Sequence, residues 1–330
     1  DDAKRIFAEQ LKKCRVDYFD VYMCHNLRAE EEWDRVYRKY GVLDFLKEMK
    51  SAGKIRHLGF SFHGQVPLLK RILEEEHWDV ALLQINALDW GKPNQAGVCY
   101  ELCRRKQVPV LVMEPLRGGR LAHLRSGTMA HLKTLNPNAS AANWGFRFVA
   151  SLDNVACVLS GVSRLEHLEE NAVTFSDGFR PLSSEEREVY VKAIAEETKD
   201  LMLVPCTWCR YCVPCPYGID IPEIFAWWNR RQLWRGLPPD GDTWRANYER
   251  WRFLHEYERA VPHLQSAEHC TGCKRCERAC PQWQFSIAEE LAKIDAYVER
   301  IRAQTRCGKG EDLLFRACSK LVELCRAVGG

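Results

Sequence analysis

The 330-residue sequence lacks any apolar run close to the ~18 residues that a membrane-spanning helix needs, so no membrane association is expected. It also lacks an excess of charge of one sign, because 48 Lys and Arg residues stand against 45 Asp and Glu residues. A dedicated nucleic-acid binder usually carries a strong positive charge, so nucleic acid is not expected as a partner. The sequence starts at Asp1 without an initiator Met, a signal peptide or an obvious first strand, and we interpret it as a fragment.

Cysteine, in contrast, is abundant: the sequence holds 16, and eight of them form two similar groups. Each group is a C-x-x-C-x-x-C triplet followed closely by a Cys-Pro pair. The two groups comprise Cys206, Cys209, Cys212 and Cys215, and then Cys270, Cys273, Cys276 and Cys280. This spacing is typical of the ligands of two 4Fe–4S clusters, which exchange single electrons. We therefore predict that these eight residues are metal ligands.

Each cluster needs four thiolates, and a short loop supplies three of them when two residues separate each pair. The fourth comes from elsewhere in the chain, and a proline after it prevents the chain from continuing as a helix. In two-cluster ferredoxins this fourth cysteine binds the other cluster. By this rule Cys280 completes the first triplet and Cys215 completes the second. Cys215 departs from the usual pattern, because it follows Cys212 after two residues rather than three.

Two other uses of these cysteines stay open. Structural zinc sites usually take cysteines in pairs, so a triplet would leave one thiolate over in each loop. Disulfides are the second alternative, and they belong mainly to secreted proteins. Because the spacing favours metal ligands over disulfides, we expect a reducing, cytoplasmic setting.

Residues 17–175 alternate short apolar runs with helical patterns. The predicted strands are 17–24, 55–62, 80–86, 108–114 and 155–160. The predicted helices are 41–52, 66–75, 95–106, 139–151 and 164–175, after an opening helix at 3–13. Strands that alternate with helices pair in parallel through right-handed crossovers. Five such units fill roughly 155 residues at the rate of an eight-unit barrel of ~250 residues, so we predict an α/β fold with a partial (β/α)8 TIM barrel.

Polar residues follow each predicted strand. They are His25, Ser61, His63, Gln84, Asn86, Glu114, Arg117 and the segment 160–163. The carboxyl ends of parallel barrel strands meet at one face, where the loops that follow them carry the chemistry. We therefore expect these side chains to contribute to one shared site.

The second half of the sequence is expected to be mostly α-helical and to hold the clusters in a ferredoxin-like domain. Its Trp- and Arg-rich stretch, 223–259, suits either stacking on single-stranded nucleic acid or two amphipathic helices that pack Trp over the clusters. The balanced charge favours the second interpretation. The expected segments are 1–178 for the partial barrel, 179–204 for a linking helix, 205–290 for the two-cluster domain and 291–330 for a helical extension.

Several stretches carry recognisable motifs. They are VDYFDVYMCH at 16–25, GKIRHLGFSFH at 53–63, QIN at 84–86, MEPLRGGR at 113–120, VLSGVS at 158–163, LEEN at 168–171 and the cluster segment at 204–222. Together they resemble the aldo-keto reductases, in particular their iron–sulfur branch. The resemblance implies reversible hydride transfer between NADP(H) or NAD(H) and a small carbonyl or alcohol. Of the family's usual catalytic Asp, Tyr, Lys and His, only the His has a counterpart here, His25; the other three are expected on units that precede residue 1.

The resemblance also implies a coenzyme site, with the nicotinamide near the ends of the second and third strands, the pyrophosphate after the fourth and the adenosine after the fifth. The residues implied are Ser61, Gln84, Asn86, Glu114, Leu116, Arg117, Gly118, Gly119, Gly161, Ser163, Glu170 and Asn171. Backbone N–H groups at a glycine turn and at a helix N-terminus suit the phosphates. His167 stands where an Arg often binds the 2′-phosphate, so the choice between NADP and NAD stays open.

These observations support three interpretations. The first is an oxidoreductase that couples hydride chemistry, through two clusters, to a redox partner protein. The second is a non-catalytic iron–sulfur module for electron transfer or redox sensing, which the missing catalytic Asp, Tyr and Lys favour. The third is an incomplete gene product, for which open sheet edges and self-association are expected.

Overall fold

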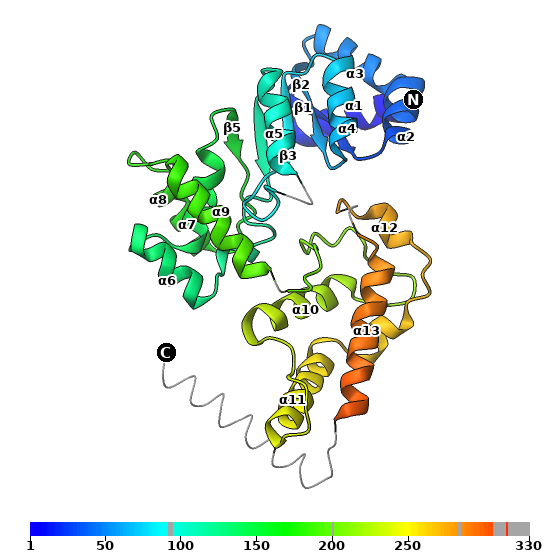
Figure 1. Ribbon diagram of the computed structural model, residues 1–330. Helices are drawn as coiled ribbons and strands as arrows, with labels where there is room; N and C mark the ends of the chain where they lie inside the picture. Colours follow the sequence, from blue (N-terminus) through cyan, green and yellow to red (C-terminus); the bar gives the residue numbers. More distant parts are fainter. Residues whose placement is uncertain (92–94, 200, 283–284, 306–314, 316–330) are drawn as a thin grey trace. The chain divides into compact units, whose positions relative to one another are not determined.

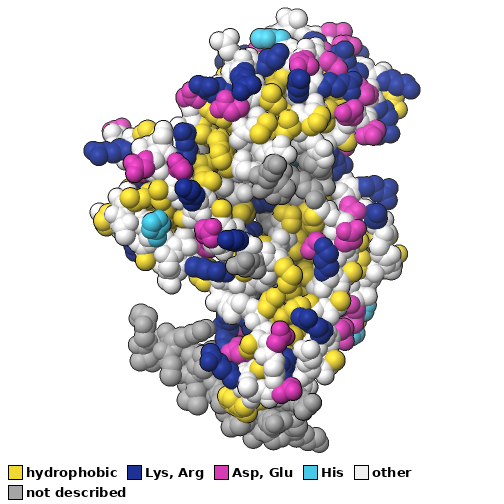
Figure 2. Space-filling model, in the orientation of Figure 1, with side chains coloured by type: hydrophobic (Ala, Val, Ile, Leu, Met, Phe, Trp, Pro, Cys, Tyr) yellow, Lys and Arg dark blue, Asp and Glu magenta, His cyan; other side chains and the backbone are white. Residues whose placement is uncertain are grey.

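The chain folds into two compact units, residues 1–199 and residues 200–330 (Figure 1). The computed structural model describes residues 1–91, 95–199, 201–282, 285–305 and 315. Within these described residues, no helix is both long enough and apolar enough to span a membrane. On the face shown in Figure 2, basic and acidic side chains are interspersed, as the balanced composition of the sequence suggests.

The first unit is built around a five-stranded parallel sheet. Its strands are β1 (Phe19–Leu27), β2 (Ile55–Phe62), β3 (Val80–Gln84), β4 (Val110–Met113) and β5 (Val155–Val158). They lie side by side in sequence order, and every neighbouring pair is parallel. This order arises when each crossover moves to the next position, as in a βα barrel, whereas a doubly wound sheet reverses its direction. The structure confirms the predicted partial barrel of five βα units.

Helices connect the strands and flank the sheet. They are α1 (Asp2–Cys14), α2 (Glu30–Glu32), α3 (Val42–Ser51), α4 (Val66–Glu75), α5 (Ala96–Arg105), α6 (Ser126–Leu135), α7 (Ala141–Ala150), α8 (Leu165–Thr174) and α9 (Ser184–Thr198), with a π-helix η1 (Trp33–Lys39) and a 3-10 turn η2 (Arg120–Ala122). The predicted helices correspond to α1, α3, α4, α5, α7 and α8. The sequence pattern missed η1 and α6, since both segments are mostly polar and α6 buries only Leu132.

Aromatic side chains fill much of the core of the first unit. The rings of Phe60 and Trp78 lie 4.9 Å apart, and Trp33 lies 6.2 Å from Trp78. Tyr190 and Ile194 of α9 are fully buried in the same core. The helix expected as a linker therefore packs within the first unit.

The second unit is helical in the part that the structure describes. Its elements are α10 (Ile221–Arg235), α11 (Trp244–Ala260), α12 (Arg275–Ala279) and α13 (Ile287–Gln304), with 3-10 turns η3 (His263–Gln265) and η4 (Ala267–His269). The two predicted Trp-rich helices are α10 and α11, and Trp227 and Trp228 are buried in the core between helices. Of the expected C-terminal extension, residues 306–314 and 316–330 lie outside the described residues.

Gly59 provides a test of the close packing in the sheet, because it lies opposite Val80 of β3. A Cβ atom at Gly59 would lie 2.5 Å from the carbonyl oxygen of Val80 and 2.6 Å from its Cγ1. We expect Gly59→Ala to push the two strands apart and lower the free energy of unfolding by about 1–3 kcal/mol, measured by urea unfolding. Gly127→Ala is the matched control, because a Cβ there meets nothing within 4 Å and alanine suits helix α6. Equal losses in the two variants would contradict this expectation.

Candidate functional site

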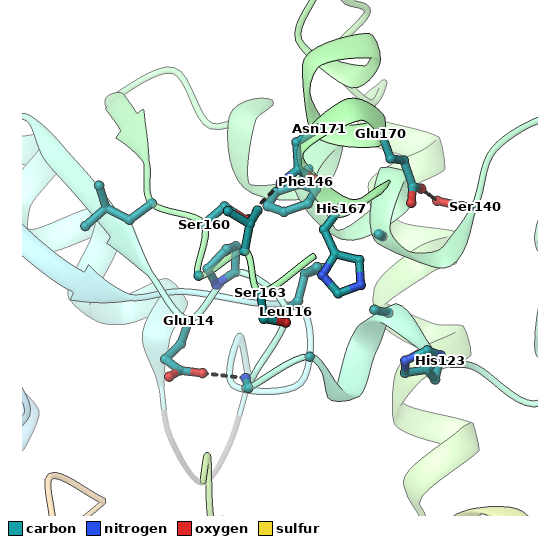
Figure 3. Close-up of a pocket in the computed structure, with 18 residues that line it drawn as sticks. Glu114, Leu116, His123, Ser140, Phe146, Ser160, Ser163, His167, Glu170 and Asn171 are labelled. Atoms are coloured by element: carbon teal, nitrogen blue, oxygen red, sulfur yellow. Dashed lines mark hydrogen bonds between the residues drawn. The ribbon is translucent and has the colours of Figure 1, made fainter. Parts of the chain in front are cut away.

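A cavity of about 500 Å³ lies in the first unit, beyond the carboxyl ends of β4 and β5 (Figure 3). Its walls are the loop after β4 (114–123), the start of α7 (140–146) and the segment from the end of β5 into α8 (159–171). This is the end of a parallel sheet at which βα units place their ligands, and the volume suits a small molecule or part of a nucleotide.

Eight of the residues implied for the coenzyme line this one cavity. They are Glu114, Leu116, Gly118, Gly119, Gly161, Ser163, Glu170 and Asn171. The loops after β4 and β5, far apart in sequence, thus face each other across the same space, as expected from the convergence of strand ends.

The loop after β4 is shaped by a buried carboxyl group. Glu114 and Arg117 both have positive backbone φ angles, 56° and 52°, which bend the chain sharply around the cavity. The backbone N–H of Gly118 donates to Glu114 Oε2 at 2.5 Å and closes the turn. Burial raises the pKa of Glu114, and the hydrogen bond from Gly118 and the charge of Arg117 act in the opposite direction. Glu114 is therefore a structural acceptor at the wall of the cavity.

The opposite wall combines polar and apolar groups. Asn171 Nδ2 donates to Ser160 Oγ at 3.0 Å, and Ser140 Oγ donates to the carboxylate of Glu170. Helix α8 begins at this wall, with Arg164 at its N-cap position. In the described part of the chain, the Arg164 side chain makes no capping hydrogen bond to the first turn of the helix. Uncapped N–H groups at the start of a helix are donors suited to an anion such as a phosphate.

Four other residues implied for the coenzyme lie outside this lining. Ser61 is 3% exposed, and its Oγ accepts a hydrogen bond from the backbone N–H of Asn26 at 2.7 Å. The other three, Gln84, Asn86 and Arg117, converge on a single residue, Asp89. Their role in coenzyme binding stays a prediction.

Asp89 collects donors from two strand ends. Its Oδ2 accepts from Gln84 Nε2 at 2.6 Å, from Asn86 Nδ2 at 2.8 Å and from Arg117 Nη1 at 2.8 Å. Asn86 also donates to the carbonyl oxygen of Glu114 at 3.0 Å, which links the loops after β3 and β4. The side chains of Asp89 and Arg117 are 1% and 2% exposed, so this ion pair is shielded from water. Shielding strengthens the attraction and raises the cost of losing either partner.

His25, the predicted catalytic residue, is exposed on β1 and lies outside the cavity lining. Its carbonyl oxygen accepts a hydrogen bond from the Tyr37 hydroxyl at 2.9 Å. Burial, together with the charges of His25 and Arg28, lowers the pKa of the neighbouring His63 to about 4. His63 is therefore neutral at pH 7. The catalytic role of His25 stays a prediction.

The cysteines of the second unit gather around its core, with Cys206, Cys212, Cys215, Cys270, Cys276 and Cys280 packed against it. Burial raises the pKa of Cys212 to about 12, and the nearby thiols of Cys206, Cys280 and Cys209 add to this effect. Cys280 likewise has a pKa raised to about 12 by burial, with Cys209 and Cys206 among its neighbours. The structure thus brings Cys280 to the first triplet.

The first cysteine loop has a backbone suited to holding sulfur atoms. Trp208 and Arg210 have positive φ angles of 58° and 63°, and the Trp208 N–H donates to Cys206 Sγ at 3.4 Å. In the second loop, burial raises the pKa of Cys276 to about 11, and Cys270 is one of the groups that contribute. Four thiols in one place are an all-sulfur donor set, the set that iron–sulfur clusters use.

These features define a βα-barrel type of domain with a cavity at the carboxyl ends of its strands, followed in sequence by a cysteine-rich helical unit. Residues 1–189 match the aldo/keto reductase family, and residues 205–285 match the 4Fe-4S dicluster domain. The chain therefore belongs to the aldo/keto reductase family.

Individual relatives are distant. The uncharacterized oxidoreductase YcsN of Bacillus subtilis (strain 168) is 27% identical over 116 residues, which are 34% of this chain and 35% of that protein. The match thus spans about a third of the curated relative. Among solved structures, an aldo-keto reductase from Bacillus halodurans is 21% identical with a TM-score of 0.46, and covers 58% of this chain and 67% of its own. One from Brucella melitensis is 16% identical with a TM-score of 0.45, and the match covers 58% of this chain and 67% of that chain.

Sequence reasoning missed Asp89, His123 and Phe146. His123 and Phe146 line the cavity, while Asp89 holds its neighbouring loops. The signal for Asp89 was its place five residues after Gln84, in the loop that follows a strand. His123 follows η2, and Phe146 lies within α7. Neither residue is at the end of a strand, so the strand-end pattern does not point to them.

The Asp89–Arg117 pair yields a stability test. Asp89→Asn keeps the shape of the side chain but leaves the charge of Arg117 buried without its carboxylate. We expect the free energy of unfolding to fall by about 3–5 kcal/mol, measured by urea unfolding. Asp20→Asn is the matched control, because Asp20 pairs with Arg56 at the surface, where the loss should be below about 1 kcal/mol. A loss below about 1 kcal/mol for Asp89→Asn would show that the buried pair does not hold the two loops.

Proposed function

We propose that this chain is an oxidoreductase that binds a nicotinamide nucleotide in the cavity of its first unit and two 4Fe–4S clusters in its second. Membership of the aldo/keto reductase family and the match to a dicluster domain support redox chemistry in general. The observation that carries the finer proposal is the gathering of the Cys280 thiol with those of Cys206, Cys209 and Cys212.

For the clusters, the donor set fits the group. Cys206, Cys209, Cys212 and Cys280 would hold the first cluster, and Cys270, Cys273, Cys276 and Cys215 the second. A bound cluster stores and passes one electron at a time. Six of these cysteines are partly buried against a core that contains aromatic side chains, while Cys209 and Cys273 are exposed, and solvent exposure is one of the factors that set the reduction potential of such centres. Two one-electron centres together match the two electrons of a hydride.

For the nucleotide, the fit lies in the donors around the cavity. The first turn of α8, which receives no side-chain cap within the described residues, offers backbone N–H groups to a pyrophosphate, and Gly119 lines the same cavity. Glu170 supplies a carboxylate of the kind that accepts hydrogen bonds from ribose hydroxyl groups. The coenzyme, when bound, supplies a hydride. His123 and His167 line the same cavity and would give imidazole donors to a further phosphate.

The substrate proposed is a small carbonyl or alcohol, and the partner a redox protein that exchanges electrons with the clusters. A reducing, cytoplasmic setting suits this proposal, because thiols serve as cluster ligands only where they are kept reduced. The choice between NADP and NAD is part of the test below.

A second candidate is an iron–sulfur electron-transfer or redox-sensing module without carbonyl chemistry. One observation favours it: Gln84, implied at the nicotinamide, and Asn86, implied for the coenzyme, both donate to Asp89 and lie outside the cavity lining. This candidate keeps the clusters but has no hydride transfer, so the nucleotide-binding experiment below separates the two candidates, whereas the iron content tests what they share.

The iron content tests the clusters. Chain prepared anaerobically should carry about eight iron atoms and show the broad absorbance of 4Fe–4S centres. Cys280→Ala removes the fourth ligand of the first cluster, and the iron content should fall by up to about half. Cys157→Ala, at an exposed cysteine of β5, is the matched control and should keep all the iron. Colourless protein, or zinc in place of iron, would remove the basis of the proposal.

Nucleotide binding tests the cavity. A Cβ at Gly161 meets nothing within 4 Å, so Gly161→Leu places its side chain in the cavity without a backbone clash. We expect the Kd for NADPH or NADH, measured by nucleotide fluorescence, to rise about tenfold or more, which is about 1.4 kcal/mol. Gly178→Leu is the matched control, since its Cβ also meets nothing and it lies outside the lining. Clusters without any nucleotide binding would favour the second candidate.

A further inference from the structure

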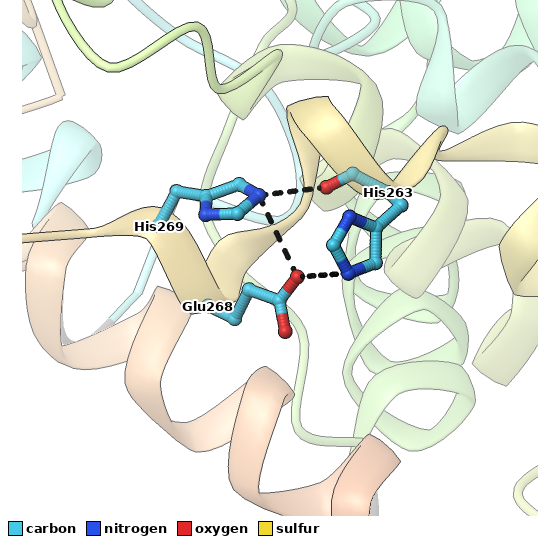
Figure 4. A group of neighbouring side chains, drawn as sticks. All are labelled: His263, Glu268 and His269. Atoms are coloured by element: carbon cyan, nitrogen blue, oxygen red, sulfur yellow. Dashed lines mark hydrogen bonds and ion pairs between the residues drawn. The ribbon is translucent and has the colours of Figure 1, made fainter.

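Three side chains of the second unit converge at a point that uses none of the cluster cysteines (Figure 4). They are His263 of η3 and Glu268 and His269 of η4. Their nearest ligand atoms, the two imidazole nitrogens and a carboxylate oxygen, all lie within 4.8 Å of one another. His263 Nε2 is 2.9 Å from Glu268 Oε1, and His269 Nε2 is 3.5 Å from the same oxygen. One carboxylate oxygen thus stands between two imidazoles.

The backbone holds this arrangement in place. Ser266, between the two turns, is 7% exposed, and its Oγ lies 3.0 Å from Glu268 Oε1 and 2.7 Å from the carbonyl oxygen of His263. Ala267 is buried, and η4 packs against α13. A ligand whose position is fixed by an outer hydrogen bond binds a metal more tightly than a freely moving one, because less conformational freedom is lost.

The local charge favours a cation. Asp295, on α13, is close enough to Glu268 and His269 for their charges to act on it: burial raises its pKa, and Glu268 contributes in the same direction. His269 Nε2 also lies 2.9 Å from the carbonyl oxygen of His263. The carboxylate of Glu268 and the carbonyl oxygen of His263 thus lie close to the imidazole nitrogens, with Asp295 near enough to add negative charge. A cation at the centre would satisfy the oxygen and nitrogen lone pairs at once.

We propose that His263, Glu268 and His269 form a binding site for a divalent transition metal ion of the zinc type. Two imidazoles and one carboxylate are a known ligand set for Zn²⁺, with bonds of about 2.0–2.2 Å and water in the remaining position. In a tetrahedral site the ligand atoms lie roughly 3.3 Å apart, so the spacing found here needs only small side-chain rotations. Both rings would bind through Nε2 with the proton on Nδ1, so the bond to the metal would replace the hydrogen bond between His269 Nε2 and the carbonyl oxygen of His263. The exposed side of His263 gives the ion a path from solvent.

This site is separate in chemistry from the cysteine groups. Imidazole and carboxylate ligands suit zinc, nickel and copper, whereas iron–sulfur clusters take thiolates. The proposal therefore goes beyond the proposed function, and it holds whether or not the first unit binds a nucleotide.

Zinc binding to the cluster-loaded chain is the test, because iron then occupies the thiols. Zn²⁺ is added at micromolar concentration, the bound zinc is counted after equilibrium dialysis, and the zinc K-edge X-ray absorption is recorded. We expect one ion per chain, with a nitrogen and oxygen shell at about 2.0–2.2 Å and no sulfur shell at about 2.3 Å. Ser266→Ala, which removes the outer hydrogen bond, should weaken binding by about 10–100-fold. His263→Ala and Glu268→Gln, which alter ligands directly, should weaken it at least as much.

The matched control is His77→Ala, at an exposed histidine of the first unit, which should leave zinc affinity unchanged. His263 and Glu268 are surface residues, so their variants are expected to keep the fold, which circular dichroism checks. The proposal is overturned if the intact chain binds no zinc at micromolar concentration or if the zinc has sulfur neighbours. It is equally overturned if His263→Ala and Glu268→Gln bind zinc as tightly as the unaltered chain.

Discussion

Gln84, at the end of β3, and Arg117, in the loop after β4, donate to the same oxygen of Asp89, and the cavity depends on this buried contact. Arg117 carries a positive φ, a conformation that needs support from its surroundings. The ion pair supplies that support, and Asn86 adds a bond to the carbonyl of Glu114. With these groups in place, Gly118 closes on the Glu114 carboxyl group and the loop turns along the wall of the cavity. A buried charge that serves the fold thus defines the space available to a ligand.

The order of the βα units could be predicted from the sequence because each strand is a short apolar run and each helix has an amphipathic face. The convergence of the loops after β4 and β5 follows from parallel topology alone. The sequence pattern could not show which of the polar side chains at the strand ends are already hydrogen-bonded within the protein. Gln84 and Asn86 stand at a strand end like Glu114, yet the carboxylate of Asp89 accepts hydrogen bonds from their amide groups. Hydrogen-bond partners depend on distances between loops, and neither periodicity nor composition contains that information.

For the cysteine groups, in contrast, a long-range partner could be predicted from the sequence. Local spacing predicted a long-range contact, since a loop with three thiols needs a fourth from elsewhere and Pro281 follows Cys280. The structure brings Cys280 to Cys206 and Cys209 across about seventy residues of sequence. The chain between them forms α10 and α11, whose buried Trp227 and Trp228 build the core on which the cysteines rest. The proximity of Cys280 to the first triplet could be predicted because ligand chemistry, unlike packing, has a fixed count of partners, while the role of these cysteines as cluster ligands stays a prediction.

The two kinds of metal ligand proposed for the second unit are adjacent in sequence, at His269 and Cys270, so their separation depends on the backbone. His269 is the last residue of η4, whereas Cys270 is extended, with φ −73° and ψ 117°. The change from a 3-10 turn to an extended chain at this point lets the two side chains leave the backbone in different directions. Figure 4 shows His269 directed toward His263, on the same side as Glu268. A one-residue shift at the end of the turn would put the Cys270 thiol where the His269 imidazole lies, so the end of η4 decides which donor faces His263 and Glu268.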